Sequence, residues 1–159
     1  MKEIQNYING KFQSPANGRT IDDINPATGE IIGTVPASTL DDVQQAVDAA
    51  NDARTAWASL TIDERVSWLD KIANSLESQS EKIASLESLD TGKPISLARG
   101  VDAARSVTNF RFFAKFAKDY TNEKFEMEDA INHVILKPVG IAGLITPWNL
   151  PLYLLSWKI

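Results

Sequence analysis

The stretch "LITPWNLPLYLLSWKI", residues 144–159, decides how the fold is interpreted. It continues a wholly apolar run, Ile141–Thr146, of the kind found in a parallel sheet that is covered on both faces. A tight loop follows at residues 147–149, and Pro151 stands near the first turn of a helix. The order strand, loop, helix predicts the opening unit of an open α/β sheet, in which ligands bind beyond the carboxyl ends of the strands.

Asn149 is the side chain of this loop that could take part in chemistry. Pro147 and Trp148 are rigid neighbours, and an amide NH2 group fixed in a dry pocket can stabilise a developing oxyanion. Asparagine is also a preferred cap of helices, and spacing alone slightly favours that role. Gly140 and Gly143 do not make the G-x-G-x-x-G fingerprint, so a buried strand and loop without a ligand stays open as an alternative.

Composition limits the possible functions. The 159 residues, of which 43% are hydrophobic, suffice for one globular domain. The net charge of -5 argues against a nucleic-acid-binding surface. The absence of cysteine excludes disulfides, thiolate metal sites and a thiol nucleophile within these residues. A single histidine, His133, leaves little material for a zinc site or a serine-histidine relay, so we expect no metal ligands and assign His133 no role.

The sequence shows no targeting or membrane-spanning segment. The opening residues "MKEIQNYINGKFQ" alternate in polarity and lack the pattern of a secretory signal. The longest apolar run begins at Leu150 and covers about 10 residues, whereas a membrane-spanning helix needs about 20. We therefore expect a cytoplasmic protein without a membrane partner.

Strands and turns are predicted for the first third of the chain. Asn9-Gly10 stands between short alternating segments, which is the strongest local signal for a two-residue hairpin turn. Pro26 and Gly29 mark a second turn, between Ile24 and a strand at Ile31–Val35.

Three long helices are predicted for the middle of the chain. The first runs from Leu40 to near Trp57, after capping residues and with acids in its first turn. The second begins at the capping box Thr61–Glu64, carries one apolar stripe as far as Leu89 and ends before Gly92. The third runs roughly from Ile95 to Lys118. Its aromatic side chains are interpreted as packing rather than as a cofactor-binding set: Phe110, Phe112, Phe113 and Phe116.

After the helices we expect a polar connection, "KDYTNEKFEMEDA", followed by an extended strand at Ile131–Val139. The predicted fold class is α/β. We divide the chain into strands and helices at 1–123, an arm at 124–139 and the first strand, loop and helix of a sheet at 140–159.

Four motifs in the same order and spacing resemble the amino-terminal part of the NAD(P)-dependent aldehyde dehydrogenase superfamily. They are "INPATGE" (Ile24–Glu30), "LDTGKP" (Leu89–Pro94), "KPVGIAGLITPWNLPL" (Lys137–Leu152) and "WKI" (Trp157–Ile159). The resemblance extends from Tyr7 to the end of the chain. Within the superfamily, "SVTNFRFFA" (Ser106–Ala114) together with "LPLYLLSWKI" is similar to the dehydrogenases that act on muconic semialdehydes.

The resemblance implies a role for individual residues. Asn149 matches the asparagine whose side chain contributes to the oxyanion hole for a cysteine thiohemiacetal. Lys158 matches a lysine suggested to assist proton relay, and a solvated or ion-paired lysine is the alternative. Asp90 and the backbone around Ile24 match a monovalent-cation site of some members. The residues that match the wall of the cofactor cleft, for NAD or possibly NADP, are Ile145, Thr146, Pro147 and Trp148.

The resemblance also implies partners and a departure. Glu126–Lys137 matches an arm that pairs subunits in dimers and tetramers, so a homo-oligomer and a small aldehyde substrate are expected. The family reaction needs a cysteine nucleophile and a water-activating glutamate. We expect both beyond Ile159, in a longer enzyme of which this chain is a segment that is inactive alone. The alternative is a non-catalytic binding or assembly module derived from the same fold, pairing through its edge strand.

Overall fold

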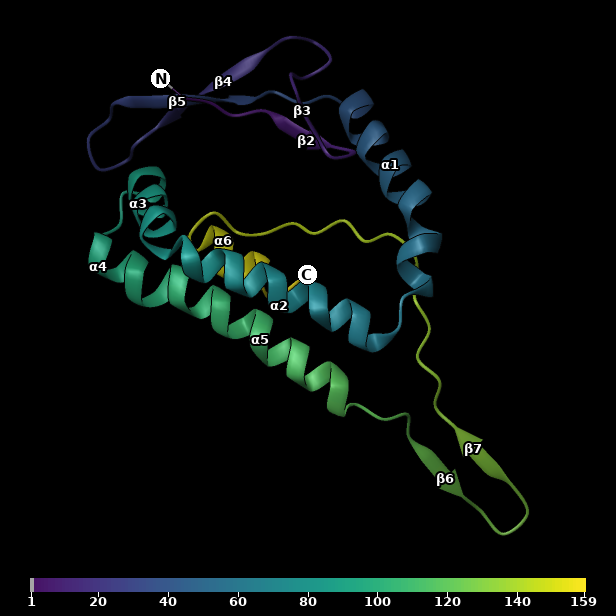
Figure 1. Cartoon of the computed structure of the whole chain (residues 1–159). Coiled ribbons are helices and arrows are strands. Elements are labelled where there is room, and N and C mark those ends of the chain that lie inside the picture. Colours follow the sequence, from purple (N-terminus) through teal and green to yellow (C-terminus); the bar gives the residue numbers. More distant parts are fainter. Residues whose placement is uncertain (1) are drawn as a thin grey trace.

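The computed structural model describes residues 2–159, which form short strand assemblies around a helical body (Figure 1). A three-stranded sheet has the order β1 (Lys2–Glu3), β5 (Ile31–Pro36), β4 (Thr20–Ile24). Strand β1 is parallel to β5, whereas β4 is antiparallel to it and carries an irregularity between Asp23 and Ile24. The mixture of helices and strands confirms the predicted α/β class.

A hairpin formed by β2 (Asn6–Ile8) and β3 (Lys11–Gln13) confirms the first turn prediction. Asn9 has a φ of 51° and Gly10 a φ of 75°. Both central residues therefore adopt the positive φ that a two-residue turn between antiparallel strands requires.

Helix α1 (Leu40–Ser59) begins as predicted and ends two residues beyond Trp57. The Asp42 carboxylate accepts hydrogen bonds from the backbone nitrogens of Thr39, at 2.7 Å, and Ala16, at 2.9 Å. Because Asp42 is buried, these bonds fix the start of α1 against the loop after β3.

The second predicted helix consists of two helices, α2 (Ile62–Ser78) and α3 (Ser80–Thr91). The prediction of one continuous helix was therefore wrong. Gln79 leaves the helical conformation with a φ of -114° and a ψ of 14°. Ser78 and Gln79 donate side-chain hydrogen bonds to the Ser75 carbonyl group, which offers the backbone an alternative to the helical ladder. The capping box at Thr61 and Glu64 is confirmed, with reciprocal bonds of 3.2 and 2.8 Å.

The break gives the helical body two small cores. In the first core, Leu69, Ala73 and Leu76 of α2 pack against Val107 and Phe110 of the next long helix. In the second core, Ile83 and Ala84 of α3 pack against Ile95, Ala98 and Ala103, which follow α3 in the chain. A straight helix from Ile62 to Thr91 would direct all its apolar side chains to one side. Two separate helices can each direct their apolar side chains at a different cluster.

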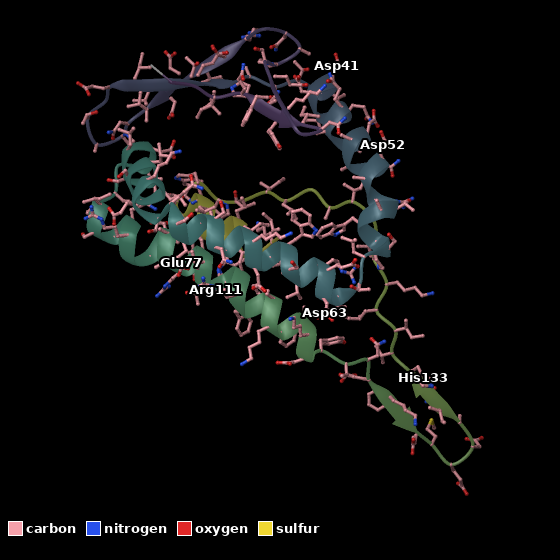
Figure 2. The ribbon with its side chains drawn as sticks, in the orientation of Figure 1. Asp41, Asp52, Asp63, Glu77, Arg111 and His133 are labelled. Carbon is pink, nitrogen blue, oxygen red and sulfur yellow. The ribbon has the colours of Figure 1, made fainter. Side chains whose placement is uncertain are left out.

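The predicted third helix is present but contains a wide turn. It consists of α4 (Ile95–Leu97), the π-helical segment η1 (Ala98–Ala103) and α5 (Ala104–Asp119). The ion pair between Arg111 of α5 and Glu77 of α2, at 2.6 Å, joins these two helices on their exposed side (Figure 2). Its hydrogen bonds lower the pKa of Glu77 and raise that of Arg111.

The packing interpretation of the phenylalanines holds only in part. Phe110 is buried in the first core. Phe112 and Phe116 stack on each other, with ring centroids 6.3 Å apart, but stay largely exposed and are not part of the core. Phe113 is half-buried and meets Trp157 edge to face, with ring centroids 6.1 Å apart.

A second hairpin extends away from the helical body (Figure 1). Strands β6 (Lys124–Glu126) and β7 (Ile131–His133) pair in it, with Phe125 opposite Asn132. The predicted strand Ile131–Val139 thus ends at His133, and its partner lies inside the segment predicted to be a polar connection. His133 is exposed on this hairpin (Figure 2).

From Val134 onward the chain runs without regular structure back toward the helices, and α6 (Pro151–Leu155) closes it (Figure 1). The helix start at Pro151 is confirmed. The strand predicted at Ile141–Thr146 is not formed, because a strand needs a hydrogen-bonding neighbour and residues 2–159 supply none there. None of the helices within residues 2–159 combines the length and apolar composition needed to cross a membrane.

Gly92 provides a test of how α3 meets the first sheet. It ends α3 with a φ of 70°, and a Cβ there would lie 2.9 Å from Pro26 Cγ and 3.0 Å from the Ala27 nitrogen. We expect Gly92→Ala to lower the free energy of unfolding by about 2–5 kcal/mol, from the left-handed backbone and the overpacking together. Gly29→Ala is the matched control, since Gly29 has a φ of 75° and no atom near its missing Cβ. Urea unfolding should give the control a loss of only about 1–2 kcal/mol, and equal losses would contradict the close approach.

Candidate functional site

A hollow of about 530 Å³ lies where the chain before α6 meets β4 and the turn after α3. The sequence-predicted residues that line it are Ile24, Asp90, Trp148 and Asn149. Lys93, which the sequence interpretation did not assign a role, lines it as well. The structure therefore gathers the predicted oxyanion donor, one residue of the predicted cofactor wall and the predicted cation site around one space.

Asn149 does not cap the helix that follows it. The N-cap residue of α6 is Leu150, and no side chain bonds to the start of that helix. Asn149 is exposed, and its carboxamide makes no hydrogen bond within residues 2–159, whereas its backbone carbonyl oxygen accepts one from Lys93 Nζ at 3.1 Å. The capping alternative is thus wrong, and the carboxamide is free to donate to a ligand.

The residues predicted to line the cofactor cleft differ in their surroundings. Ile145 is 85% exposed and Trp148 is 86% exposed, whereas Thr146 is half-buried. Pro147 is exposed between them. The run thus presents two large uncovered apolar side chains, Ile145 before a short turn and Trp148 at its first residue.

Lys158 lies on the turn after α6 and is exposed. Its ammonium group donates a hydrogen bond to the carbonyl oxygen of Ile145. It makes no ion pair with a carboxylate of the described residues. The structure therefore brings Lys158 to the predicted cofactor segment, and its role in proton relay stays a prediction.

A buried charge cluster beneath the hollow was missed from the sequence. Lys93 Nζ lies 3.0 Å from Asp102 Oδ1 and 3.7 Å from Glu87 Oε2. Glu87 Oε1 accepts a hydrogen bond from the Leu152 backbone nitrogen at 3.1 Å. The side chain of Asp102 is fully buried, and those of Glu87 and Lys93 nearly so. The available signal was Asp102 itself, a carboxylate four residues after Ala98 and four before Ser106, on the buried side of a helix.

Burial shapes the electrostatics of this region. It raises the pKa of Glu87, and the nearby Asp102 carboxylate raises it further, against the Leu152 N–H and the Lys93 ammonium group. The pKa of Asp90 is raised by burial and by the carboxylate of Asp23, while Lys93 opposes the shift. One cation thus balances several acids around the hollow.

Asp90 and Ile24 line the same hollow, as their predicted part in a cation site requires. No group of three or more histidine, aspartate or glutamate side chains in residues 2–159 is arranged to hold a metal ion. The monovalent-cation site therefore stays a prediction.

Comparison with known proteins identifies a family. Residues 12–159 match the model of the aldehyde dehydrogenase family. The chain is 41% identical to the 2-hydroxymuconic semialdehyde dehydrogenase of Pseudomonas sp. (strain CF600), over the whole chain and 34% of that protein. It is 46% identical to the 2-aminomuconic semialdehyde dehydrogenase of Mus musculus, over 98% of the chain and 32% of that protein.

A solved structure supports the same assignment. The NAD+ complex of an aldehyde dehydrogenase from Bacillus cereus superimposes with a TM-score of 0.91 at 36% identity, covering 99% of this chain and 33% of that one. The chain thus spans about a third of the length of the relatives that it matches.

The raised pKa of Glu87 predicts a pH-dependent stability difference. Since the folded state holds the Glu87 proton more tightly than the unfolded state, this group's contribution to stability is present at low pH and is lost as pH rises. We therefore expect the stability of Glu87→Gln relative to the parent to increase as pH rises above about 4, the range in which an ordinary glutamate ionises. Urea unfolding at a series of pH values measures it.

Glu64→Gln is the control with the opposite sign. Hydrogen bonds from Thr61 lower the pKa of Glu64, so its ionised form stabilises the fold and the variant should lose relative stability as pH rises. A relative stability of Glu87→Gln that falls with pH in the same way would contradict the assigned burial effect.

Proposed function

The chain belongs to the aldehyde dehydrogenase family, and from this premise we propose that it supplies the oxyanion donor and part of the cofactor wall of an NAD-dependent dehydrogenase that oxidises an aldehyde to the carboxylic acid. The relatives named above favour a muconic semialdehyde as the aldehyde. NADP stays possible as the cofactor.

The observation that carries the proposal is the free carboxamide of Asn149 at the edge of the hollow. When a nucleophile adds to an aldehyde, negative charge develops on the carbonyl oxygen. An NH2 group that is already in place and not bonded elsewhere can donate to that oxygen without first giving up another partner. Lys93 and Trp148 line the same space.

The residues present fit one wall of a nucleotide cleft. Ile145 and Trp148 are large apolar side chains with little protein cover, which suits contact with the flat face of a ring or with a ribose. When bound, NAD accepts the hydride in this class of reaction. The residues of this chain would support the bound cofactor and hold the substrate oxygen beside it.

The remaining groups of the reaction are proposed to lie elsewhere in a longer protein. The 159 residues contain no cysteine, so the thiol that forms the thiohemiacetal, and the glutamate that activates water, are placed beyond Ile159. We assign Lys158 to proton relay near Ile145. Subunit pairing is assigned to the arm at 124–139, whose β6–β7 hairpin is exposed along its length.

The missing thiol gives a direct prediction. We expect the purified 159-residue chain to produce no NADH from an aldehyde, because it lacks the nucleophile that the reaction needs. Absorbance at the NADH band, measured with a muconic semialdehyde and NAD, tests this. Steady NADH production would refute the proposed division of the catalytic groups.

The role of Asn149 is tested in the full-length product of the natural reading frame. We expect Asn149→Ala to lower kcat by about 10²–10³-fold, since one oxyanion donor typically contributes that much. Asn122→Ala, an exposed residue on the loop before β6, is the control and should leave kcat unchanged. Unchanged turnover in Asn149→Ala would contradict the proposal, and so would a stop codon directly after Ile159 in the natural gene.

A further inference from the structure

Lys93 connects the buried charge cluster to the loop that carries Asn149. Its Nζ donates hydrogen bonds to Asp102 Oδ1 at 3.0 Å and to the Asn149 carbonyl oxygen at 3.1 Å. The Lys93 side chain is 10% exposed and that of Asp102 is fully buried. Water therefore competes little for the bond to Asp102, which anchors the ammonium group, whereas the bond to Asn149 lies at the exposed edge of the hollow.

The chain is attached to the same cluster a second time, three residues later. The Leu152 backbone nitrogen donates to Glu87 Oε1 at 3.1 Å. Between the two attachments the chain passes from Asn149 into α6, a helix of only five residues. So short a helix does not hold its own geometry in water, so its direction depends on tertiary bonds of this kind.

The Asn149 carbonyl group and the Asn149 side chain share one Cα atom. A bond that fixes the carbonyl group restricts the backbone torsion beside that atom and therefore the direction in which the side chain leaves it. The carboxamide has no hydrogen bond of its own within residues 2–159 that could set this direction. The backbone bond to Lys93 is thus the polar interaction available to do so.

We infer that Lys93 is a positioning residue for Asn149: held by the buried Asp102 carboxylate, its ammonium group fixes the Asn149 backbone so that the carboxamide faces the hollow. The inference rests on the proposed function of Asn149 as oxyanion donor. It adds a group whose role is to set the geometry of the oxyanion donor. Misplacing a catalytic group by about 1 Å can cost roughly 10²-fold in rate, so the effect is measurable.

The choice of variant follows from the charges. Asp102 Oδ2 and Glu87 Oε2 have no hydrogen-bond partner among the described residues, so removing Lys93 alone would leave two buried carboxylates without their counter-charge. Lys93→Met is therefore combined with Asp102→Asn, which removes one of those charges together with the lysine. Arg111→Met is the control, because it breaks an ion pair of the same helical body and neither Arg111 nor Glu77 lines the hollow.

The test is a double-mutant cycle in the full-length gene product. We expect Lys93→Met/Asp102→Asn to lower kcat roughly 10²-fold while circular dichroism stays unchanged. In an Asn149→Ala background the same pair of changes should alter kcat less than about threefold, because the group that it positions is gone. Arg111→Met should leave kcat unchanged in both backgrounds.

Each other outcome overturns the inference. Additive losses in the Asn149→Ala background would mean that Lys93 acts independently of Asn149, and an unchanged kcat would mean that it does not act. Loss of folding in Lys93→Met/Asp102→Asn, which leaves the net charge unchanged, would mean that the cluster is required for the fold and does not specifically orient Asn149.

A second measurement separates this inference from the proposed function. If Asn149→Ala leaves kcat unchanged, the oxyanion role fails, and the structural part is judged by hydrogen exchange over residues 149–156. Lys93→Met/Asp102→Asn should speed exchange there and Arg111→Met should not. Unchanged exchange in the first variant would overturn the attachment itself.

Discussion

The ion pair between Lys93 and Asp102 is the interaction on which the candidate site depends. It joins the turn after α3, the π-helical segment η1 and, through the Asn149 carbonyl group, the chain before α6. A buried pair of this kind contributes little net stability compared with apolar residues of the same size, because both charges lose water. Its energetic importance lies in the cost of breaking it, which restricts these three segments to one arrangement.

The wide turn of η1 and the break at Gln79 both serve this arrangement. The break lets α3 pack against Ala98 and Ala103 while α2 packs against Phe110, so that two small apolar clusters form. Between Ala98 and Ala103 the wide turn places Asp102 inside, where an apolar residue would be expected. Single π-helical turns inside α-helices occur frequently at functional sites, and here the turn delivers a carboxylate beneath the hollow.

Local signals explain what could be predicted from the sequence. The Asn9-Gly10 turn, the capping box at Thr61 and the start of α6 at Pro151 are each fixed by the chemistry of a few neighbouring residues. The strand expected at Ile141–Thr146 depends on a partner, and an apolar run does not specify one. The break at Gln79 depends on which helix each half packs against, which periodicity cannot report.

The candidate site shows the same division. The loop chemistry singled out Asn149, the family motif added Trp148, and the structure places both at the hollow. The burial of Lys93 and Glu87 was not predicted, because charged residues are expected to face solvent. Their burial follows from the left-handed turn at Gly92, which returns the chain so that Lys93 lies between two helical carboxylates.

The wide turn of η1 also determines how this helix could change in length. A π-helical turn takes up one residue more than an α-helical turn, so the α-helices on either side keep their faces in spite of the added residue. Deleting one residue within η1 would leave an ordinary α-helix, with Phe110 still directed at α2, but would move Asp102 out of its inward position. The helix would still form after the deletion, but Lys93 would lose its ion pair with Asp102.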